Sequence, residues 1–117
     1  MSEELSAHLD LDALEMLKEI MEDEFSLLIN TFLNDAVERI EQINAAINAK
    51  NSEDIRRAAH SFKGSSANIG AHVLQGLCLV LEDAGHNGDT SLAPEMAKRI
   101  EQEFKIISQL LKSNYLA

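Results

Sequence analysis

Residues 25–47 read FSLLINTFLNDAVERIEQINAAI, and apolar side chains recur through this segment at every third or fourth position. The apolar stripe consists of Phe25, Leu28, Ile29, Phe32, Ala36, Ile40, Ile43 and Ile47. A spacing of three, four and seven residues, kept over roughly six turns, lies along one face of an α-helix. Asn34, Asp35 and Glu38 fall on the opposite face, so the segment predicts a long helix with one buried and one solvated side.

One further helix is predicted on each side of this one. Asp10 is a favourable N-cap for a short helix ending near Met21, and the acidic chain up to Leu9 is expected to be a flexible N-terminus. Residues 10–117 are then expected to form a single domain. After the long helix, Asn51 or Ser52 is suited to cap a helix that ends at Gly70, a residue free to adopt the left-handed conformation. This helix is expected to bury Ile55, Ala59, Phe62, Ser66 and Ile69.

The last part of the chain predicts two more helices. One passes through Leu74, Leu77, Cys78 and Leu81 and gives way to a turn-rich loop at residues 85–88. Ser91 is a candidate N-cap for the other, with Pro94 in the first turn, where its missing N–H costs nothing. Short connections favour antiparallel neighbours. The sequence therefore predicts an all-α fold, an antiparallel up-down four-helix bundle with a short additional N-terminal helix capping one end.

Composition narrows the classes of partner. The chain has a formal charge of −10, from 20 acidic and 10 basic side chains, which repels nucleic acid and anionic membranes. No apolar run approaches the ~20 residues that span a bilayer, and the acidic N-terminus is unlike a secretory signal. We expect a cytoplasmic protein, and the initiating Met1 without a linker-like leader favours a freestanding chain over the terminal domain of a larger kinase.

Metal and thiol chemistry have little support in the sequence. Cys78 is the single cysteine, which excludes an intramolecular disulfide and a cysteine-rich zinc site. No two histidines stand at i and i+4, so a helical metal site is not expected, and we predict no metal or other cofactor in the chain.

The third predicted helix contains the candidate chemistry, in the segment AHSFKGSSANIGA at residues 59–71. With the buried stripe set at zero, His60 points roughly 140° away and is expected to be exposed. Arg56, Arg57, Gly64 and Ala67 share this outward arc, and Lys63 lies at its edge. Glycine inside a helix costs about 1 kcal/mol relative to alanine. Because Gly64 faces away from the core, we expect it to give clearance to another protein.

A neutral imidazole has a ring nitrogen free to attack phosphorus. Phosphorylation adds up to about two negative charges, which Lys63 at i+3 is placed to offset, with Arg56 as a possible helper. The second ring nitrogen needs an acceptor to fix the tautomer. Glu82, and less directly Gln75, are candidates on the following helix.

The run His60 to Ala67 (HSFKGSSA), followed by Gly70 and Ala71, resembles the histidine phosphotransfer (HPt) domains of bacterial phosphorelays. The resemblance covers about residues 10–115. It implies that His60 accepts a phosphoryl group from the aspartate of one receiver domain and passes it to another. It also implies that Lys63 is the charge partner, Gly64 the clearance and Glu82 the imidazole partner. The receiver would supply the acidic pocket and its Mg²⁺. Phe62 stands where leucine is common in the family.

The sequence offers candidate docking residues and more than one function. Arg56, Arg57 and Ala67 are candidate docking residues or plain surface, and Met16, Ile20 and Met21 belong either to the core or to the docking surface. We expect a monomeric carrier without autonomous kinase activity. The alternatives are a phosphorylation-independent helical adaptor and a metal-binding bundle.

Overall fold

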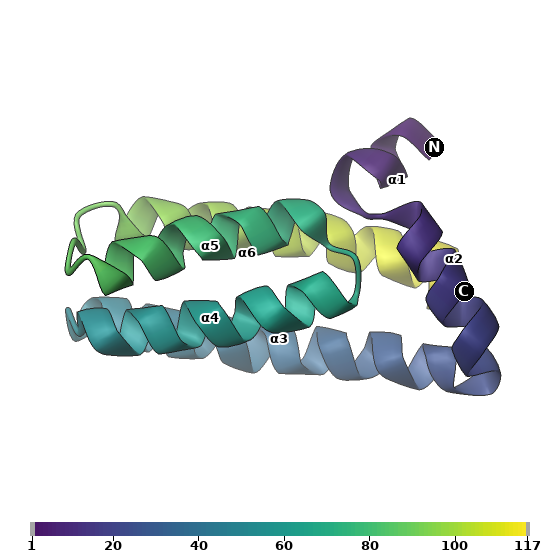
Figure 1. The fold of residues 1–117 in the computed structure, drawn as a ribbon, viewed down its shortest axis with the longest axis horizontal. Helices are drawn as coiled ribbons and strands as arrows, with labels where there is room; N and C mark the ends of the chain where they lie inside the picture. Colours follow the sequence, from purple (N-terminus) through teal and green to yellow (C-terminus); the bar gives the residue numbers. More distant parts are fainter. Residues whose placement is uncertain (1, 117) are drawn as a thin grey trace.

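The computed structural model describes residues 2–116, with side chains from Glu4 onward, and all regular structure in this range is helical. Four long helices form the bundle: α3 (Phe25–Asn48), α4 (Ser52–Asn68), α5 (His72–His86) and α6 (Ala93–Leu111). Successive helices of the bundle run in opposite directions, which confirms the predicted antiparallel architecture (Figure 1). None of the helices within residues 2–116 is long and apolar enough to cross a bilayer.

The N-terminal elements lie at one end of this bundle (Figure 1). The predicted short helix is α2 (Leu11–Met21), which is followed by a 3-10 turn, η1 (Glu22–Glu24), and caps the end at which α3 begins. A further helix, α1 (Ser2–His8), packs against α5. The described residues end in a π-helical turn, η2 (Lys112–Leu116). Its Tyr115 ring meets the ring of Phe25 edge-on, with 5.7 Å between the ring centroids.

Helix α3 buries the predicted stripe and somewhat more. Five of the predicted residues are at most 5% exposed, namely Phe25, Ile29, Phe32, Ala36 and Ile43, whereas Leu28, Ile40 and Ile47 are only partly buried. Leu33 and Ala46 are buried in addition. Because α3 packs against both α4 and α6, its contact face is wider than a single stripe.

Helix α4 buries the stripe that the sequence predicts. Ile55, Ala59, Phe62, Ser66 and Ile69 are all at most 1% exposed. The ring of Phe62 lies 6.4 Å from that of Phe32 on α3, measured between centroids. Packing along the whole stripe prevents α4 from rotating about its axis, so the direction of every outward side chain on α4 is set by the core.

Predicted capping residues stand at the starts of α2 and α4 and at the end of α4. The side chains of Asp10 and Asn51 accept hydrogen bonds of 3.1 Å from the backbone N–H groups of Ala13 and Asp54, respectively. Gly70 has a φ of +75°, and the N–H of Ala71 bonds back to Ser66, so α4 ends in a Schellman motif. The carbonyl of Gly70 also accepts from the N–H of Asp10 at 2.7 Å, which ties the N-terminal segment to the α4–α5 turn.

The chain before Asp10 differs from the flexible segment expected from the sequence. It forms α1, and Leu9 is 1% exposed. His8 Nδ1 lies 2.8 Å from a carboxylate oxygen of Glu103, a residue of α6 that is itself 6% exposed. The anchor for α1 is thus a buried acid ninety-five positions away, which a local reading of the acidic N-terminus does not detect. Met1 lies outside the described residues.

Two boundaries near the α5–α6 turn also differ from the prediction. Helix α5 continues through Gly85 and His86, which the sequence placed in a loop, and the left-handed residue is Gly88, with a φ of +72°. Ser91 does not cap α6, because its hydroxyl and its N–H both donate to Asp89 at 2.6 and 3.0 Å. The helix begins at Ala93 instead, with Pro94 in the first turn as predicted.

Gly85 lies at a close approach of α5 to the backbone of α4. A Cβ atom at this position would lie 2.7 Å from the backbone nitrogen of Arg56 and 2.8 Å from the carbonyl oxygen of Ser52. No side chain fits at these distances without moving one backbone from the other. The absence of a side chain at Gly85 therefore lets the two helices pack closely, and both contribute residues to the site described below.

We predict opposite effects for two glycine-to-alanine substitutions in α5. Gly85→Ala should lower the free energy of unfolding by about 1–3 kcal/mol, because the new methyl group collides with the backbone of α4. Gly76→Ala is the matched control. Gly76 is exposed, a Cβ there would have no neighbour within 4 Å, and alanine should stabilise the helix by about 0.5–1 kcal/mol. Urea unfolding followed by circular dichroism measures both. Equal effects at the two positions would contradict the close-packing argument.

Candidate functional site

His60 lies on the outward face of α4, near the middle of the helix. Its side chain is 62% exposed, whereas the neighbouring Ala59 is fully buried. The prediction that His60 faces solvent is therefore confirmed. Of the other described histidines, His8 hydrogen-bonds to Glu103, and His72 hydrogen-bonds to the backbone carbonyl of Ala7.

One ring nitrogen of His60 is held by a carboxylate from the next helix. His60 Nδ1 lies 2.7 Å from Glu82 Oε2 on α5. An ionised carboxylate only accepts hydrogen bonds, so Nδ1 must be the protonated nitrogen in the neutral ring. The lone pair then resides on Nε2, which has no hydrogen-bond partner among residues 4–116. The arrangement presents a nucleophilic nitrogen to solvent.

Glu82 bridges two cationic or potentially cationic groups of α4. Its Oε1 lies 2.6 Å from Lys63 Nζ, while its Oε2 contacts the imidazole. The side chains of Glu82 and Lys63 are 15% and 26% exposed, so this ion pair is partly shielded from water. The sequence favoured Glu82 as the imidazole partner, with Gln75 as a less direct candidate. The structure brings Glu82, and not Gln75, to His60.

The electrostatics of this cluster keep Glu82 ionised. Burial by itself raises the pKa of the Glu82 carboxyl, but Lys63 and His60 together outweigh that effect, and the net pKa lies below its ordinary value of 4.5. A carboxylate that stays charged is the form that orients the imidazole. Beneath this cluster, burial and the Glu82 charge raise the pKa of the Cys78 thiol to about 12, against the opposing effect of Lys63. Cys78 is fully buried and is not a nucleophile at neutral pH.

Gly64 and Ala67 form a low, exposed surface beside His60. A Cβ on Gly64 would have no neighbouring atom within 4 Å, so no packing inside the chain requires glycine there. Ala67 is exposed one turn further along α4. This geometry agrees with the expected clearance for a partner, although that role stays a prediction.

The two arginines preceding His60 are partly neutralised within their own helix. Arg56 and Arg57 both pair with Glu53, Arg57 through its Nε at 3.3 Å. The hydrogen bonds and charge of Arg56 lower the pKa of the Glu53 carboxyl, with Arg57 contributing less. Both arginines are therefore accounted for as surface residues paired with Glu53. Their docking role stays a prediction.

The candidate docking residues of α2 lie apart from the histidine cluster. Met16 and Ile20 are 62% and 71% exposed, one turn apart on the outer face of α2. Met21 is partly buried and packs against the core. Figure 1 places α2 at the end of the bundle, whereas His60 belongs to the middle of α4. The sequence left these three residues open between the core and the docking surface. Met21 belongs to the core, whereas Met16 and Ile20 are on the surface.

Within residues 2–116, no group of three or more histidine, cysteine, aspartate or glutamate side chains is close enough together to hold a metal ion. The cluster of His60, Glu82 and Lys63 is instead an arrangement of one nucleophile, one carboxylate and one ammonium group.

Comparison with known proteins shows similarity over most of the chain. The sequence profile of the Hpt domain matches residues 27–110. Among solved structures, the chain is similar to histidine-containing phosphotransfer protein B (HptB) from Pseudomonas aeruginosa PAO1, with 42% sequence identity and a TM-score of 0.89. That similarity covers 91% of this chain and 92% of the other. A comparison with curated protein sequences gives no significant match.

We predict a pH-dependent contribution of Glu82 to stability. Because the folded pKa of Glu82 is below 4.5, the carboxylate stabilises the native state fully above about pH 4.5, and this contribution is lost as the pH falls through the lower folded value. Glu82→Gln should therefore lower the free energy of unfolding by about 1 kcal/mol at neutral pH, and by less near pH 3. Urea unfolding at both pH values measures this. Glu95→Gln, which removes an exposed pair with Arg99, is the control and should have little effect. A Glu82→Gln effect that is independent of pH would contradict the prediction.

Proposed function

Because the chain belongs to the Hpt domain family, whose members interact with receiver domains, we propose that it is a phosphoryl carrier in a two-component phosphorelay. His60 accepts a phosphoryl group from the phospho-aspartate of one receiver domain and passes it to another. The observation that supports this most directly is the contact between His60 Nδ1 and Glu82, which leaves Nε2 exposed as the nucleophile.

The transfer is a displacement at phosphorus. The Nε2 lone pair of His60 forms the N–P bond while the P–O bond to the receiver's aspartate breaks, and the aspartate leaves as a carboxylate with the bonding electron pair. Nδ1 keeps its proton, so the phosphorylated ring gains a positive charge. Glu82, whose pKa is lowered, stabilises that charge at 2.7 Å. Attack by the aspartate of a second receiver reverses the same steps.

Lys63 is the group placed to respond to the new phosphate. In this structure its Nζ is paired with Glu82, one turn of α4 from His60. The phosphoryl group brings up to about two negative charges to the same exposed face. Lys63 then divides its charge between Glu82 and the phosphoryl oxygens, which makes the phosphohistidine more persistent.

The partner supplies the remaining parts of the reaction. The receiver holds the Mg²⁺ and the acidic pocket, and this chain binds no cofactor of its own and has no autonomous kinase activity. The receiver approaches over Gly64 and Ala67, with Arg56 and Arg57 at one side and the exposed Met16 and Ile20 at the end of the bundle. The carrier acts as a cytoplasmic monomer.

The first test is phosphoryl transfer in vitro. Incubation with phosphorylated receiver domains of the source organism should label the chain with acid-labile phosphate on a histidine. His60→Gln should abolish the label, because glutamine has no comparable nucleophile. His86→Gln is the matched control, since the side chain of His86 is exposed and makes no hydrogen bond with the side chains or backbone of residues 4–116. It should be labelled at the wild-type rate.

Two results would refute the assignment. Label that survives His60→Gln would show that another residue is the acceptor. Receiver binding that is unchanged in His60→Ala, together with no transfer in either direction, would favour the phosphorylation-independent adaptor.

A second prediction concerns the clearance at Gly64. Gly64→Gln should keep or slightly raise the free energy of unfolding, because the site is open and glutamine favours helix. It should nevertheless slow transfer at least tenfold, because the longer side chain obstructs the receiver. Gly76→Gln is the control, an equally open helical glycine about 120° around α5 from Glu82. Normal transfer by Gly64→Gln would overturn the clearance argument.

A further inference from the structure

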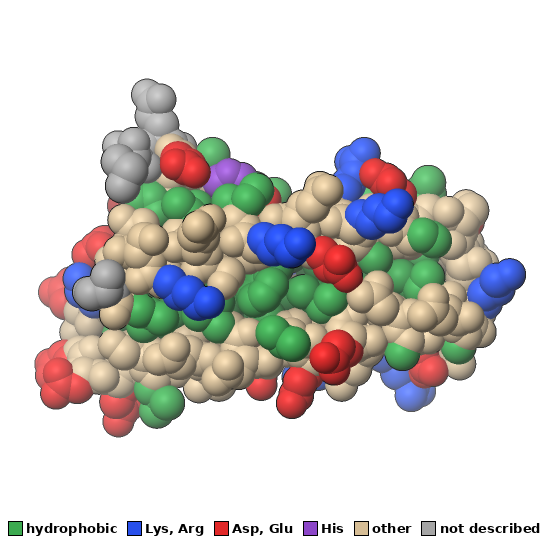
Figure 2. Space-filling model, turned by 180° about the vertical axis from the view of Figure 1, so that it is seen from behind, with side chains coloured by type: hydrophobic (Ala, Val, Ile, Leu, Met, Phe, Trp, Pro, Cys, Tyr) green, Lys and Arg blue, Asp and Glu red, His purple; other side chains and the backbone are tan. Residues whose placement is uncertain are grey.

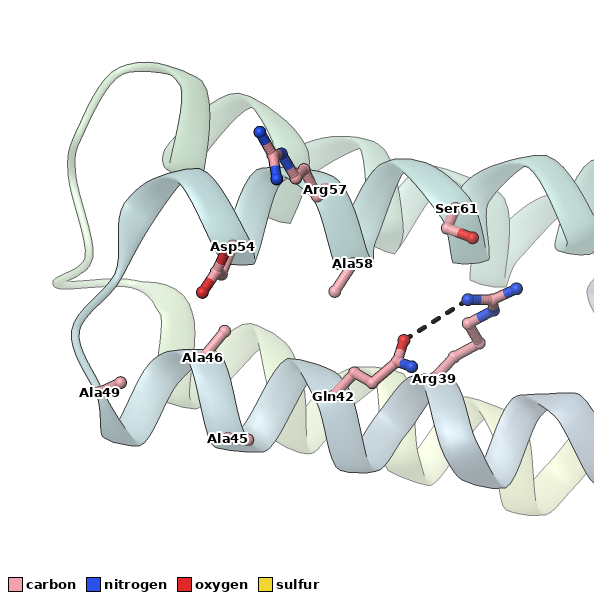
Figure 3. A pocket seen from close by; sticks show the side chains of 9 residues that line it. All are labelled: Arg39, Gln42, Ala45, Ala46, Ala49, Asp54, Arg57, Ala58 and Ser61. Atoms are coloured by element: carbon pink, nitrogen blue, oxygen red, sulfur yellow. Dashed lines mark hydrogen bonds between the residues drawn. The ribbon is translucent and has the colours of Figure 1, made fainter.

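A groove between α3 and α4 lies beside the histidine cluster and is not used by the proposed chemistry. It has a volume of about 450 Å³. Figure 3 shows α3 below and α4 above, with the guanidinium of Arg39 extending from α3 toward the part of α4 that bears Ser61. The groove is lined by Arg39, Gln42, Ala45, Ala46, Ala49, Asp54, Arg57, Ala58 and Ser61.

Arg39 differs from the other arginines of the chain. Arg56 and Arg57 pair with Glu53, and Arg99 pairs with Glu95. Arg39 has no carboxylate within ion-pair distance among the side chains of residues 4–116. Its side chain makes one hydrogen bond within residues 4–116, a long one of 3.4 Å from Nη1 to the side-chain oxygen of Gln42. Most of its five N–H donors are thus available to a ligand.

The side chain of Arg39 does not pair with the acidic residue that its own helix offers. Asp35 stands one turn earlier on α3, at the i−4 position where an acid commonly pairs with arginine. The structure contains no such pair. The side chain of Arg39 is instead partly buried and turned across the groove, on a chain whose formal charge is −10.

The groove is close enough to His60 to be covered by the same partner. Arg57 and Ser61 line it, and they stand one turn before His60 and one residue after it on α4. A standard protein interface buries about 800 Å² on each partner, which corresponds to a patch roughly 16 Å in radius. Packed helices lie about 8–10 Å apart, so a partner centred on His60 also covers Arg39 on α3.

We propose that this groove binds an acidic side chain of the receiver domain that docks over His60, with Arg39 as the residue that pairs with its carboxylate. This inference rests on the proposed function. The alanines at positions 45, 46 and 58 leave room for an inserted side chain, and the planar guanidinium binds a carboxylate through two parallel hydrogen bonds. The lining of the groove includes two arginines and one acid, Asp54, and Arg57 is already paired with Glu53, so Arg39 is the side chain of the groove that attracts a carboxylate most strongly. Arg39 therefore sets the register of docking and contributes to the choice of receiver.

The test is a kinetic comparison on intact protein. A panel of phosphorylated receiver domains from the source organism is assayed with the wild-type chain, and the most efficient donor is kept. Arg39→Ala should raise KM about fivefold or more for that donor, with kcat within twofold, because Arg39 contacts the partner and not the reacting atoms. Arg39→Lys should restore part of the loss, and Arg39→Glu should be worse than Arg39→Ala. The KM of Arg39→Ala should also depend less on salt concentration than that of the wild type.

Controls separate this inference from folding effects and from the proposed function. Arg99→Ala removes an arginine from α6, a helix that contributes nothing to the groove, and should leave KM unchanged. Thermal unfolding of each variant confirms that the fold is intact. Efficient wild-type transfer with an unchanged KM in Arg39→Ala and Arg39→Glu would overturn this inference alone. A wild-type chain that accepts phosphate from no receiver of the panel would overturn the proposed function, and this inference with it.

Discussion

The site depends on one carboxylate, that of Glu82, which contacts the imidazole of His60 with one oxygen and the ammonium group of Lys63 with the other. This bridge determines which nitrogen of the ring is protonated, and so which nitrogen is exposed as a nucleophile. It depends on the close approach of α5 to α4, and Gly85 allows that approach because a side chain there would collide with the backbone of α4. A position without a side chain, less than one turn from Glu82, thus supports the geometry of the reacting group.

The bundle separates a rigid inner face of α4 from an open outer one. The inner stripe, which includes Phe62 and Ser66, is fully buried and fixes the rotation of the helix. The outer face presents His60 beside Gly64, where nothing in the chain occupies the space. Such a division suits a carrier, because the nucleophile must be pre-oriented while the rest of the reaction centre arrives with another protein. The cost of an exposed glycine within a helix is small compared with the packing energy of the stripe behind it.

Charge is distributed unevenly on this acidic chain, and the distribution favours one docking direction. On the face of the molecule shown in Figure 2, basic and acidic side chains are interspersed. Helix α4 carries three basic side chains near the site, and all are already paired, Lys63 with Glu82 and both Arg56 and Arg57 with Glu53. Arg39 is the arginine left without a carboxylate in the described chain, and it is turned into the groove next to α4. Because paired charges attract a partner weakly, the unpaired guanidinium has more influence on the orientation of an approaching acidic surface than the number of basic residues suggests.

The sequence by itself determined the features that depend on helical periodicity and on neighbours within one turn. These include the buried stripe of α4, the outward direction of His60, the capping residue Asp10 and the terminator Gly70, because each follows from 3.6 residues per turn or from a local hydrogen bond. The sequence left the cap of α4 open between Asn51 and Ser52, and in the structure Asn51 is the cap. Only the tertiary structure decided which side chains from different helices meet. It brought the predicted Glu82 into contact with the imidazole, anchored α1 through Glu103, made Gly85 a packing position and left Arg39 without a carboxylate. The physical reason is that these contacts depend on the rotation and spacing of packed helices, which no single helical pattern specifies.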